Sequence, residues 1–364
     1  MKKLVTLALV LASANAFATR ARVTALGEAT HLVDVATVYK NAADILKLSD
    51  SLTIESGLTN VAPGAQTMNQ GAEGLLIRSM GESKFALSLG HDDKTIYRLR
   101  EAAVGSAAGL RGQQNPVELM YGLKMGDMGL AGGLYYSNYQ NKTAGAEEKE
   151  GTMGLRFGMR LGIISAEAQV GLMDKWQKDA PAPALEYKGK TLIRAKVGVD
   201  VMPDLNVYGE VLSAGYKTTN AGADAADVDA MELKLGALSA VKKDGTEFFY
   251  GVALANETSK EKVADAKTTK MYMPLIIGLE SEANSWLTLR GSVTQNLVFL
   301  DSEKVEAAGA TTKDNNPGLN STKFAAGAGL KFNKVTVDGT ILAAGTQNIN
   351  GANLLGTVGL TYTF

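Results

Sequence analysis

Charged residues that could do chemistry recur with a period of two in several stretches of the chain. Arg156 and Arg160 alternate with apolar neighbours, and Arg194 and Lys196 do the same a little further along. Alternate side chains of a β-strand share one face, so each stretch is predicted to be a strand with one charged and one apolar face. The full set of candidates on the charged face is Arg78, Glu118, Lys124, Arg156, Arg160, Glu167, Arg194, Lys196, Glu210, Glu232, Lys234, Arg290 and Lys323.

Two interpretations of this charged face stay open at the level of sequence. Rings of ionic side chains along a water-filled passage set its ion preference, so these residues are candidates for lining a pore. The same side chains can instead pair with one another as salt-bridge ladders that only keep the wall wetted.

The direction in which the charged face points separates a membrane barrel from a soluble sheet. An unpaired Arg or Lys facing lipid at mid-depth costs about 2–4 kcal/mol, so in a membrane these residues must face inward, into water. A large soluble antiparallel sheet has the same period but turns its polar face outward. The stretch 353–364 favours the membrane, because Leu360, Tyr362 and Phe364 occupy alternate positions and the last residue is aromatic. Interfacial aromatic residues of this kind are typical of lipid-embedded barrels.

The separators between the predicted strands indicate the architecture. Short separators rich in Gly, Asp and Asn alternate with long polar ones, including 138–149, 176–187, 218–228 and 258–268. We therefore predict an all-β fold, a closed antiparallel transmembrane β-barrel with short periplasmic turns and long extracellular loops. The count is about 16 strands, or about 14 if 51–57 belongs to the N-terminal segment.

The first residues predict export. Met1-Lys2-Lys3 precedes a short apolar run, and Ala16-Phe17-Ala18 forms an A-x-A cleavage site. This combination predicts a secretory signal peptide over 1–18. The predicted organisation is then 1–18 as signal peptide, 19–50 as an N-terminal periplasmic segment or plug, and 51–364 as the barrel. Export together with a barrel predicts localisation to the bacterial outer membrane.

The segment 19–50 has a helical rather than a strand-like pattern. Apolar residues at Val35, Val38, Ala42, Ile45 and Leu48 are spaced by three and four, which predicts a short amphipathic helix. Such a helix could plug or cap the periplasmic mouth of the barrel. The alternative is a loosely ordered N-terminal tail.

The long separator 91–115 is a candidate constriction loop. It carries Arg98, Arg100, Glu101 and Arg111, which would narrow a pore if the loop folded inward. Connecting segments usually run over the surface, so an outward loop is slightly preferred.

Composition disfavours catalysis and several classes of partner. The chain has no Cys and two His, which removes thiolate nucleophiles and Cys metal sites. No base–nucleophile pair is recognisable, so we predict a non-enzyme with no catalytic residue, no metal and no cofactor. The net charge of -1 gives no bulk field for binding nucleic acid.

The strand run of 51–364 and its C-terminal residues Val358, Leu360, Tyr362 and Phe364 resemble the outer-membrane porins of Gram-negative bacteria. The resemblance implies that Tyr362 and Phe364 form the signal read by the barrel-assembly machinery. It also implies contact with outer-membrane lipid and lipopolysaccharide, and a homotrimer.

A second likeness lies in the N-terminal segment. Ala25-Leu26-Gly27 and Asn41-Ala42-Ala43 are similar to the start of FadL-type fatty-acid transporters, which usually carry Asn-Pro-Ala at the second of these positions. That likeness implies a barrel with a plugged lumen and a hydrophobic ligand.

Three functions follow as expectations. The first is a porin-like channel for passive diffusion of small hydrophilic solutes or ions. The second is a plugged barrel that transports or binds a hydrophobic ligand. The third is a structural or adhesive surface barrel with a blocked lumen.

Overall fold

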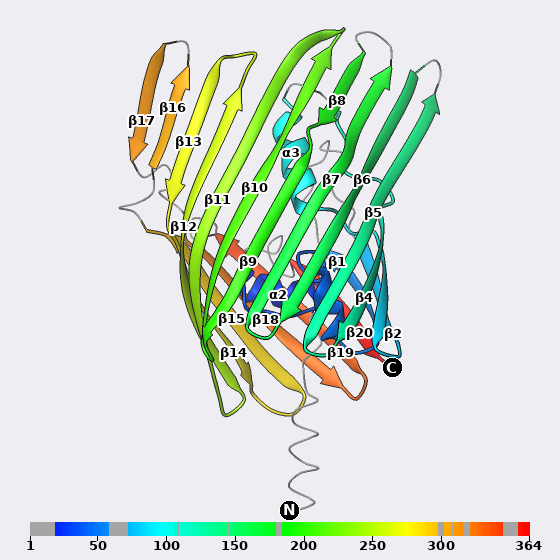
Figure 1. The fold of residues 1–364 in the computed structure, drawn as a ribbon, viewed down its shortest axis with the longest axis vertical. Coiled ribbons are helices and arrows are strands. Elements are labelled where there is room, and N and C mark those ends of the chain that lie inside the picture. Colours follow the sequence, from blue (N-terminus) through cyan, green and yellow to red (C-terminus); the bar gives the residue numbers. More distant parts are fainter. Residues whose placement is uncertain are drawn as a thin grey trace, which may run out of the picture.

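An antiparallel sheet closes on itself around a central lumen (Figure 1). The structure is a computed structural model that describes residues 19–57, 72–105, 107, 109–143, 146–179, 184–297, 302–307, 309–315, 321–344 and 356–364. The predicted signal peptide, 1–18, and the predicted loops 58–71 and 345–352 lie outside the described residues. Closure comes from β1 (Ser51–Gly57) and β20 (Thr357–Thr363), which pair antiparallel along their whole length.

The strands between these two follow the chain in order around the wall. They are β2 (Ala72–Met80), β3 (Ser83–Leu89), β4 (Val117–Met125), β5 (Met128–Thr143), β6 (Ala146–Leu161), β7 (Ile164–Asp179), β8 (Leu185–Gly189), β9 (Leu192–Met202), β10 (Leu205–Asn220), β11 (Ala223–Lys243), β12 (Thr246–Glu261), β13 (Ala266–Tyr272), β14 (Pro274–Glu282), β15 (Leu287–Asn296), β16 (Ser302–Ala307), β17 (Ala310–Asn315), β18 (Lys323–Phe332) and β19 (Val335–Ala344).

The wall has 16 strands, because four of them are interrupted and carry two labels each. β8 and β9 both pair with β7 and β10, so they are two parts of one strand. In the same way β13 continues into β14, β15 into β16, and β17 into β18. The predicted fold, a closed antiparallel barrel of this size, is confirmed.

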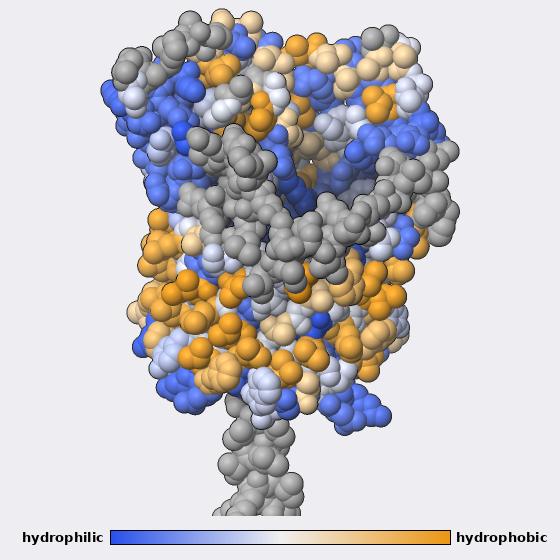
Figure 2. Space-filling view, turned by 180° about the vertical axis from the view of Figure 1, so that it is seen from behind, coloured by the Kyte–Doolittle hydropathy of each residue, from blue (hydrophilic) through white to orange (hydrophobic). Residues whose placement is uncertain are grey.

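A belt of apolar side chains surrounds the lower part of the wall (Figure 2). Leu119, Leu235 and Leu289 are 56%, 57% and 48% exposed, and the other members include Leu130, Phe157, Ile193, Leu254, Ile277, Phe332 and Leu360. An apolar surface of this extent is too large for a soluble monomer, whereas lipid chains match it. The chain is therefore an outer-membrane barrel.

Above the belt, strands continue where the sequence predicts loops. β10 and β11 pair as far as Asn220 and Ala223, so most of the predicted loop 218–228 is strand. The predicted loops 138–149, 176–187 and 258–268 are likewise partly strand. β5 to β12 reach into the tall upper part of the wall in Figure 1. Its outward side chains are polar there, as in the ion pairs of Lys262 with Asp227 and Asp229.

The N-terminal segment lies inside the barrel. It contains α2 (Arg20–Ala25), which contacts β15, β18, β19 and β20, and the 3-10 helix η1 (Ala42–Leu46), which contacts β3 to β6. We call residues 19–50 the plug. The predicted apolar set is buried as expected, with Val38, Ala42 and Ile45 fully so. The predicted amphipathic helix is wrong in form, because the Asn41 side chain caps a short 3-10 turn instead of an α-helix.

The plug supplies the apolar core of the lower barrel. Val38 and Ile45 pack with Leu75, Ile77 and Met120 from the wall. Leu26 and Leu32 pack with Leu238 and Phe249 on the other side. No described helix is long and apolar enough to span a membrane.

Candidate functional site

One end of the plug is fixed to the wall by buried ion pairs. Arg22 of α2 donates to both carboxylate oxygens of Glu280, at 2.6 and 2.9 Å, and also pairs with Asp34 of the plug at 3.1 Å. Glu280 is shared with Arg290, which in turn pairs with Asp338 at 2.5 Å. Every charge in this cluster has an opposite charge within bonding distance, which compensates its removal from bulk water.

The other end of the plug rests on β6 and β7. The Asn41 amide donates to the carbonyl of Ala166 at 3.3 Å, and Arg160 donates to Asp44 at 2.7 Å. Gly158 lies directly beneath: a Cβ there would stand 2.1 Å from Asn41 Oδ1 and 2.3 Å from the Ala43 nitrogen. The wall therefore needs a glycine at 158 for the plug to approach this closely.

Both short motifs that resemble FadL-type transporters are contact points of the plug. Asn41-Ala42-Ala43 forms the contact with Gly158, and Ala25-Leu26-Gly27 ends α2 against the opposite wall. A Cβ on Gly327 would stand 2.7 Å from the Ala25 side chain, so the wall needs a glycine at this second contact too.

The loop between β3 and β4 also folds into the lumen. It contains α3 (Lys94–Ala103), which Figure 1 shows inside the upper barrel. Asp93 caps the helix through the amides of Thr95 and Ile96 and pairs with Arg156 of the wall at 2.5 Å. Burial raises the pKa of the Asp93 carboxyl, but Arg156 and the amide donors outweigh it and bring the pKa down to about 2. Asp93 is thus ionised at neutral pH, and the helix start is fixed.

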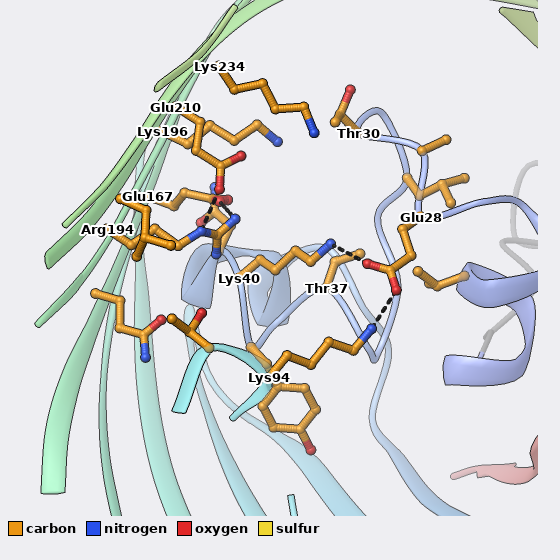
Figure 3. A pocket seen from close by; sticks show the side chains of 18 of the residues that line it. Glu28, Thr30, Thr37, Lys40, Lys94, Glu167, Arg194, Lys196, Glu210 and Lys234 are labelled. Carbon is orange, nitrogen blue, oxygen red and sulfur yellow. Dashed lines mark hydrogen bonds and ion pairs between the residues drawn. The ribbon is translucent and has the colours of Figure 1, made fainter. Parts of the chain in front are cut away.

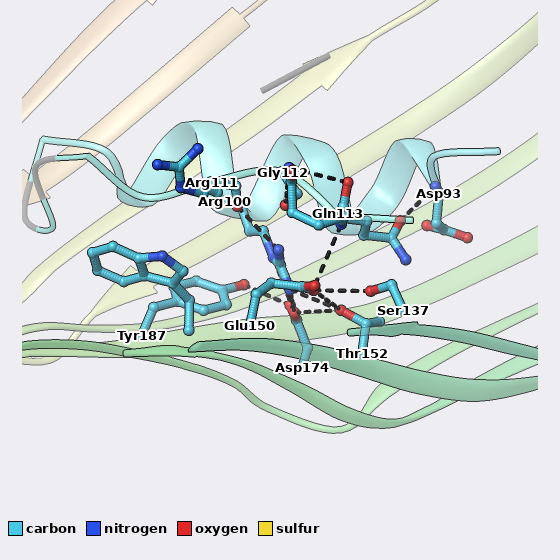
Figure 4. Close-up of polar contacts among 12 residues, drawn as sticks. Asp93, Arg100, Arg111, Gly112, Gln113, Ser137, Glu150, Thr152, Asp174 and Tyr187 are labelled. Carbon is cyan, nitrogen blue, oxygen red and sulfur yellow. Dashed lines mark hydrogen bonds and ion pairs between the residues drawn. The ribbon is translucent and has the colours of Figure 1, made fainter. Parts of the chain in front are cut away.

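Arg100 fixes the middle of α3 (Figure 4). Its guanidinium is fully buried, donates to Glu150 at 2.8 Å and Thr152 at 2.7 Å, and reaches Asp174 from Nε at 3.0 Å. Arg111 further along the loop pairs with Glu148 at 2.5 Å. The preferred outward arrangement of 91–115 is therefore wrong: the buried acids of β6 and β7 attract the two arginines inward. That the loop constricts a solute path remains a prediction.

A cavity of about 990 Å³ lies between the plug, α3 and the wall (Figure 3). The plug contributes Glu28, Thr30 and Lys40, and α3 contributes Lys94 and Arg98. The wall side comes mainly from β7 and β9 to β13.

Charges on the cavity wall alternate from strand to strand. Glu167, Lys196, Glu210 and Lys234 are register partners in turn across β7, β9, β10 and β11. Arg194 lies two residues from Lys196 on the same face of β9, and it pairs with Glu167 at 3.1 Å and with Glu210 at 2.6 Å. Both acids therefore form their ion pairs with Arg194 and lie next to Lys196 in register. Among the described residues, no ion pair involves Lys196 or Lys234, although the Lys196 ammonium lies 5.1 Å from the Tyr208 ring centroid.

The predicted charged set divides into residues at the cavity and residues away from it. Those at the cavity are Arg156, Arg160, Glu167, Arg194, Lys196, Glu210, Glu232, Lys234 and Lys323, together with Arg98 of the loop. Glu118 and Arg290 face inward but are buried in ion pairs beneath α3 and α2. Lys124, at the exposed periplasmic end of β4, and Glu101, exposed on α3, do not line the cavity.

The predicted pore-lining position of Arg78 is wrong. It lies on the outer rim, where it pairs with Asp50 at 3.7 Å and stacks over the Phe364 ring at 4.8 Å. The inward face of β2 is apolar at Leu75 and Ile77, because it packs against the plug. The rule that charged faces point inward therefore fails on this strand.

Tyr362 and Phe364 point outward from the wall. Their rings meet edge-on at 5.5 Å, and they are 38% and 48% exposed. Their position at the belt is consistent with interfacial anchoring, and their role as an assembly signal remains a prediction.

Three cavity residues, Glu28, Lys40 and Lys94, were missed by the sequence prediction. Glu28 and Lys40 lie in turns and Lys94 begins α3, so no strand periodicity marks the side that they face. Among the described residues, no group of three or more His, Asp or Glu side chains is placed to hold a metal ion.

Comparison with known proteins gives only distant likenesses. No family model and no curated protein matches the chain. Among solved structures, the P. putida toluene transporter TodX has a TM-score of 0.43 at 10% identity, covering 94% of this chain and 98% of that one. A Pseudomonas aeruginosa FadL homologue has a TM-score of 0.41 at 11% identity, covering 94% and 97%. A loop-deletion mutant of OmpT, an outer-membrane protein of Vibrio cholerae, has 0.38 at 10%, covering 87% and 99%.

Proposed function

We propose that this chain is a plugged outer-membrane channel that binds a small amphipathic ligand with an acidic group and releases it when the plug moves. The observation that carries the proposal is the cavity above the plug, with Lys196 and Lys234 on its wall. The chain acts as a binding and transport protein, not as an enzyme.

The plug distinguishes this function from an open diffusion channel. Passive diffusion needs a continuous aqueous path, and residues 19–50 lie across the lower lumen in close contact with both sides of the wall. The plugged alternative from the sequence therefore fits better than the open channel.

The lysines indicate the polar end of the ligand. A cation enclosed in a protein cavity is costly unless an opposite charge accompanies it. Glu167 and Glu210 form their ion pairs with Arg194, and among the described residues no ion pair involves Lys196 or Lys234. A carboxylate on the ligand would give these lysines a direct ion-pair partner. TodX is named a toluene transporter, but a hydrocarbon would bring no charge to pair with these lysines.

Apolar residues of the same cavity accommodate the rest of the ligand. Leu32 and Val33 of the plug, Leu99 of α3 and Leu212 of β10 all line it. A purely structural barrel would gain nothing from a cavity that combines such side chains with lysines that have no ion pair among the described residues. The third expectation, a structural or adhesive barrel, therefore fits less well.

Binding of a matched pair of probes tests this function. We expect 4-phenylbutyrate to bind the purified barrel more tightly than the uncharged 4-phenylbutanol, measured by titration calorimetry in detergent. In the double variant Lys196→Met and Lys234→Met, affinity for the acid should fall about ten-fold or more, equivalent to about 1.4 kcal/mol. Affinity for the alcohol should hardly change.

The control variant is Lys242→Met with Lys243→Met, which removes two exposed lysines of β11 near the periplasmic turn. It should bind both probes as the unmodified chain does. Equal binding of acid and alcohol by the unmodified chain would contradict the proposal.

A further inference from the structure

We propose that Lys40 and Lys94 form the acid-binding subsite together with Lys196 and Lys234, which line the same cavity. Glu28 is the built-in occupant of this subsite, and a ligand carboxylate loosens the plug by displacing Glu28 from Lys40 and Lys94. The inference rests on the proposed function and names the contact through which ligand binding would act on the plug.

Glu28 joins the two elements that fold into the lumen (Figure 3). One carboxylate oxygen, Oε1, lies 2.5 Å from Nζ of Lys94 on α3. The other, Oε2, lies 3.4 Å from Nζ of Lys40 on the plug. A ligand carboxylate has the same two oxygens and the same charge, so it can take both lysines in the same way.

The contact of Glu28 with the two lysines is exposed to the cavity, so a ligand carboxylate can reach the lysines and replace the Glu28 carboxylate. The side chains of Glu28, Lys40 and Lys94 are 42%, 35% and 53% exposed. Ion pairs as open as these are weak, because water competes for both partners. The buried pairs of Arg22 and Arg100 are much less accessible to a ligand. The Glu28 pairs are thus the bridge between plug and α3 that a solute in the cavity can reach.

Glu28 is ionised and therefore a true competitor of an anionic ligand. The positive charge of Lys40 lowers the pKa of the Glu28 carboxyl most, outweighing the rise caused by partial burial, and Lys94 lowers it further. A ligand acid must consequently displace a charged group and not a neutral one.

The backbone connects this carboxylate to the fixed part of the plug. Glu28 has φ of 59° and follows Gly27 with φ of 64°, so two successive residues are left-handed. The Glu28 amide donates to the carbonyl of Val23 at 2.8 Å, which ties the turn to α2. A non-glycine residue in this region is conformationally unfavourable, so loss of the lysine contacts favours rearrangement of the turn that ends α2.

Competition for the two lysines makes the coupling reciprocal. A ligand shifts a conformational equilibrium only through its different affinity for the two states. In the closed state of the plug, Glu28 pairs with Lys40 and Lys94. In the loosened state these two lysines are free to pair with the ligand carboxylate. Acid binding and plug release should therefore favour each other.

The test is the isosteric variant Glu28→Gln, which removes the competing charge. We expect 4-phenylbutyrate to bind this variant about ten-fold more tightly than the unmodified chain, with 4-phenylbutanol unchanged. Adding Lys40→Met and Lys94→Met should abolish the gain. Glu28→Asp, which keeps the charge, should remain close to the unmodified chain, and Glu82→Gln in an exposed turn is the control for loss of one carboxylate.

Two results would overturn the inference in different ways. If the unmodified chain prefers the acid but Glu28→Gln does not strengthen its binding, the proposed function stands and the role of Glu28 is wrong. If no variant prefers the acid over the alcohol, the proposed function itself is wrong and the inference falls with it. If Glu28→Gln does not fold, the single variant Lys94→Met tests the inference instead. The inference requires Lys94→Met to bind 4-phenylbutyrate more weakly than the unmodified chain, and unchanged affinity would contradict it.

Discussion

Replacing Gly158 with leucine is expected to force the plug off the wall and make the barrel leak. The new Cβ would stand 2.1 Å from Asn41 Oδ1 and 2.8 Å from the Ala42 nitrogen, and the further side-chain atoms would enter the plug itself. Overpacking of this kind costs about 1–3 kcal/mol, and about 1.4 kcal/mol changes the ratio of two states ten-fold. The swelling rate of proteoliposomes in a small sugar should rise accordingly.

Gly132→Leu is the matched control. Gly132 lies opposite Phe157 on the same strand pair, and nothing stands closer than 3.8 Å to a Cβ there. This variant should swell like the unmodified chain, and both variants should keep the heat-modifiable migration of a folded barrel on a gel. Equal swelling of the two variants would mean that the contact at Gly158 does not hold the plug.

Replacing Arg100 with methionine is expected to release α3 from the wall. The guanidinium is fully buried, and its loss leaves Glu150 and Asp174 without their main counter-charge. Removing one partner of a buried ion pair costs about 3–5 kcal/mol. The loop between Gly90 and Pro116 should become sensitive to limited proteolysis while the wall remains intact.

Arg98→Met on the same helix is the comparison for this change. Arg98 is exposed and faces the cavity, so its replacement should leave α3 docked. If both variants are cleaved at the same rate, the buried cluster is not what fixes the helix.

The wall was predictable from sequence where one of its faces meets lipid. The strand 335–344 has the predicted bounds, because Val335 and Val337 face lipid and alternate with polar neighbours. Above the membrane, Ala226 and Val228 of β11 face inward and pack in an apolar cluster with the loop that follows α3, whereas Asp227 and Asp229 form ion pairs on the outer side. The outward face is thus polar there and not apolar, and this part of the strand was predicted as loop.

The candidate site was predictable only on its wall side. Arg194 and Lys196 follow the strand period and were placed on the correct face. Arg78 was misplaced because the plug makes the inward face of its strand apolar. The plug's apolar residues Val38 and Ile45 were recognisable by spacing, but their position in the lumen depends on long-range contacts. Glu28, Lys40 and Lys94 meet only through that packing.

The most direct test of the plugged channel is conductance in planar lipid bilayers, with and without residues 19–50. The full barrel should be nearly silent, because the plug contacts the wall on both sides of the lumen. The shortened barrel should show steady conductance steps after its folding is confirmed on a gel. Steady steps of equal size from the full barrel would contradict the plug, since the lumen would then be open with residues 19–50 in place.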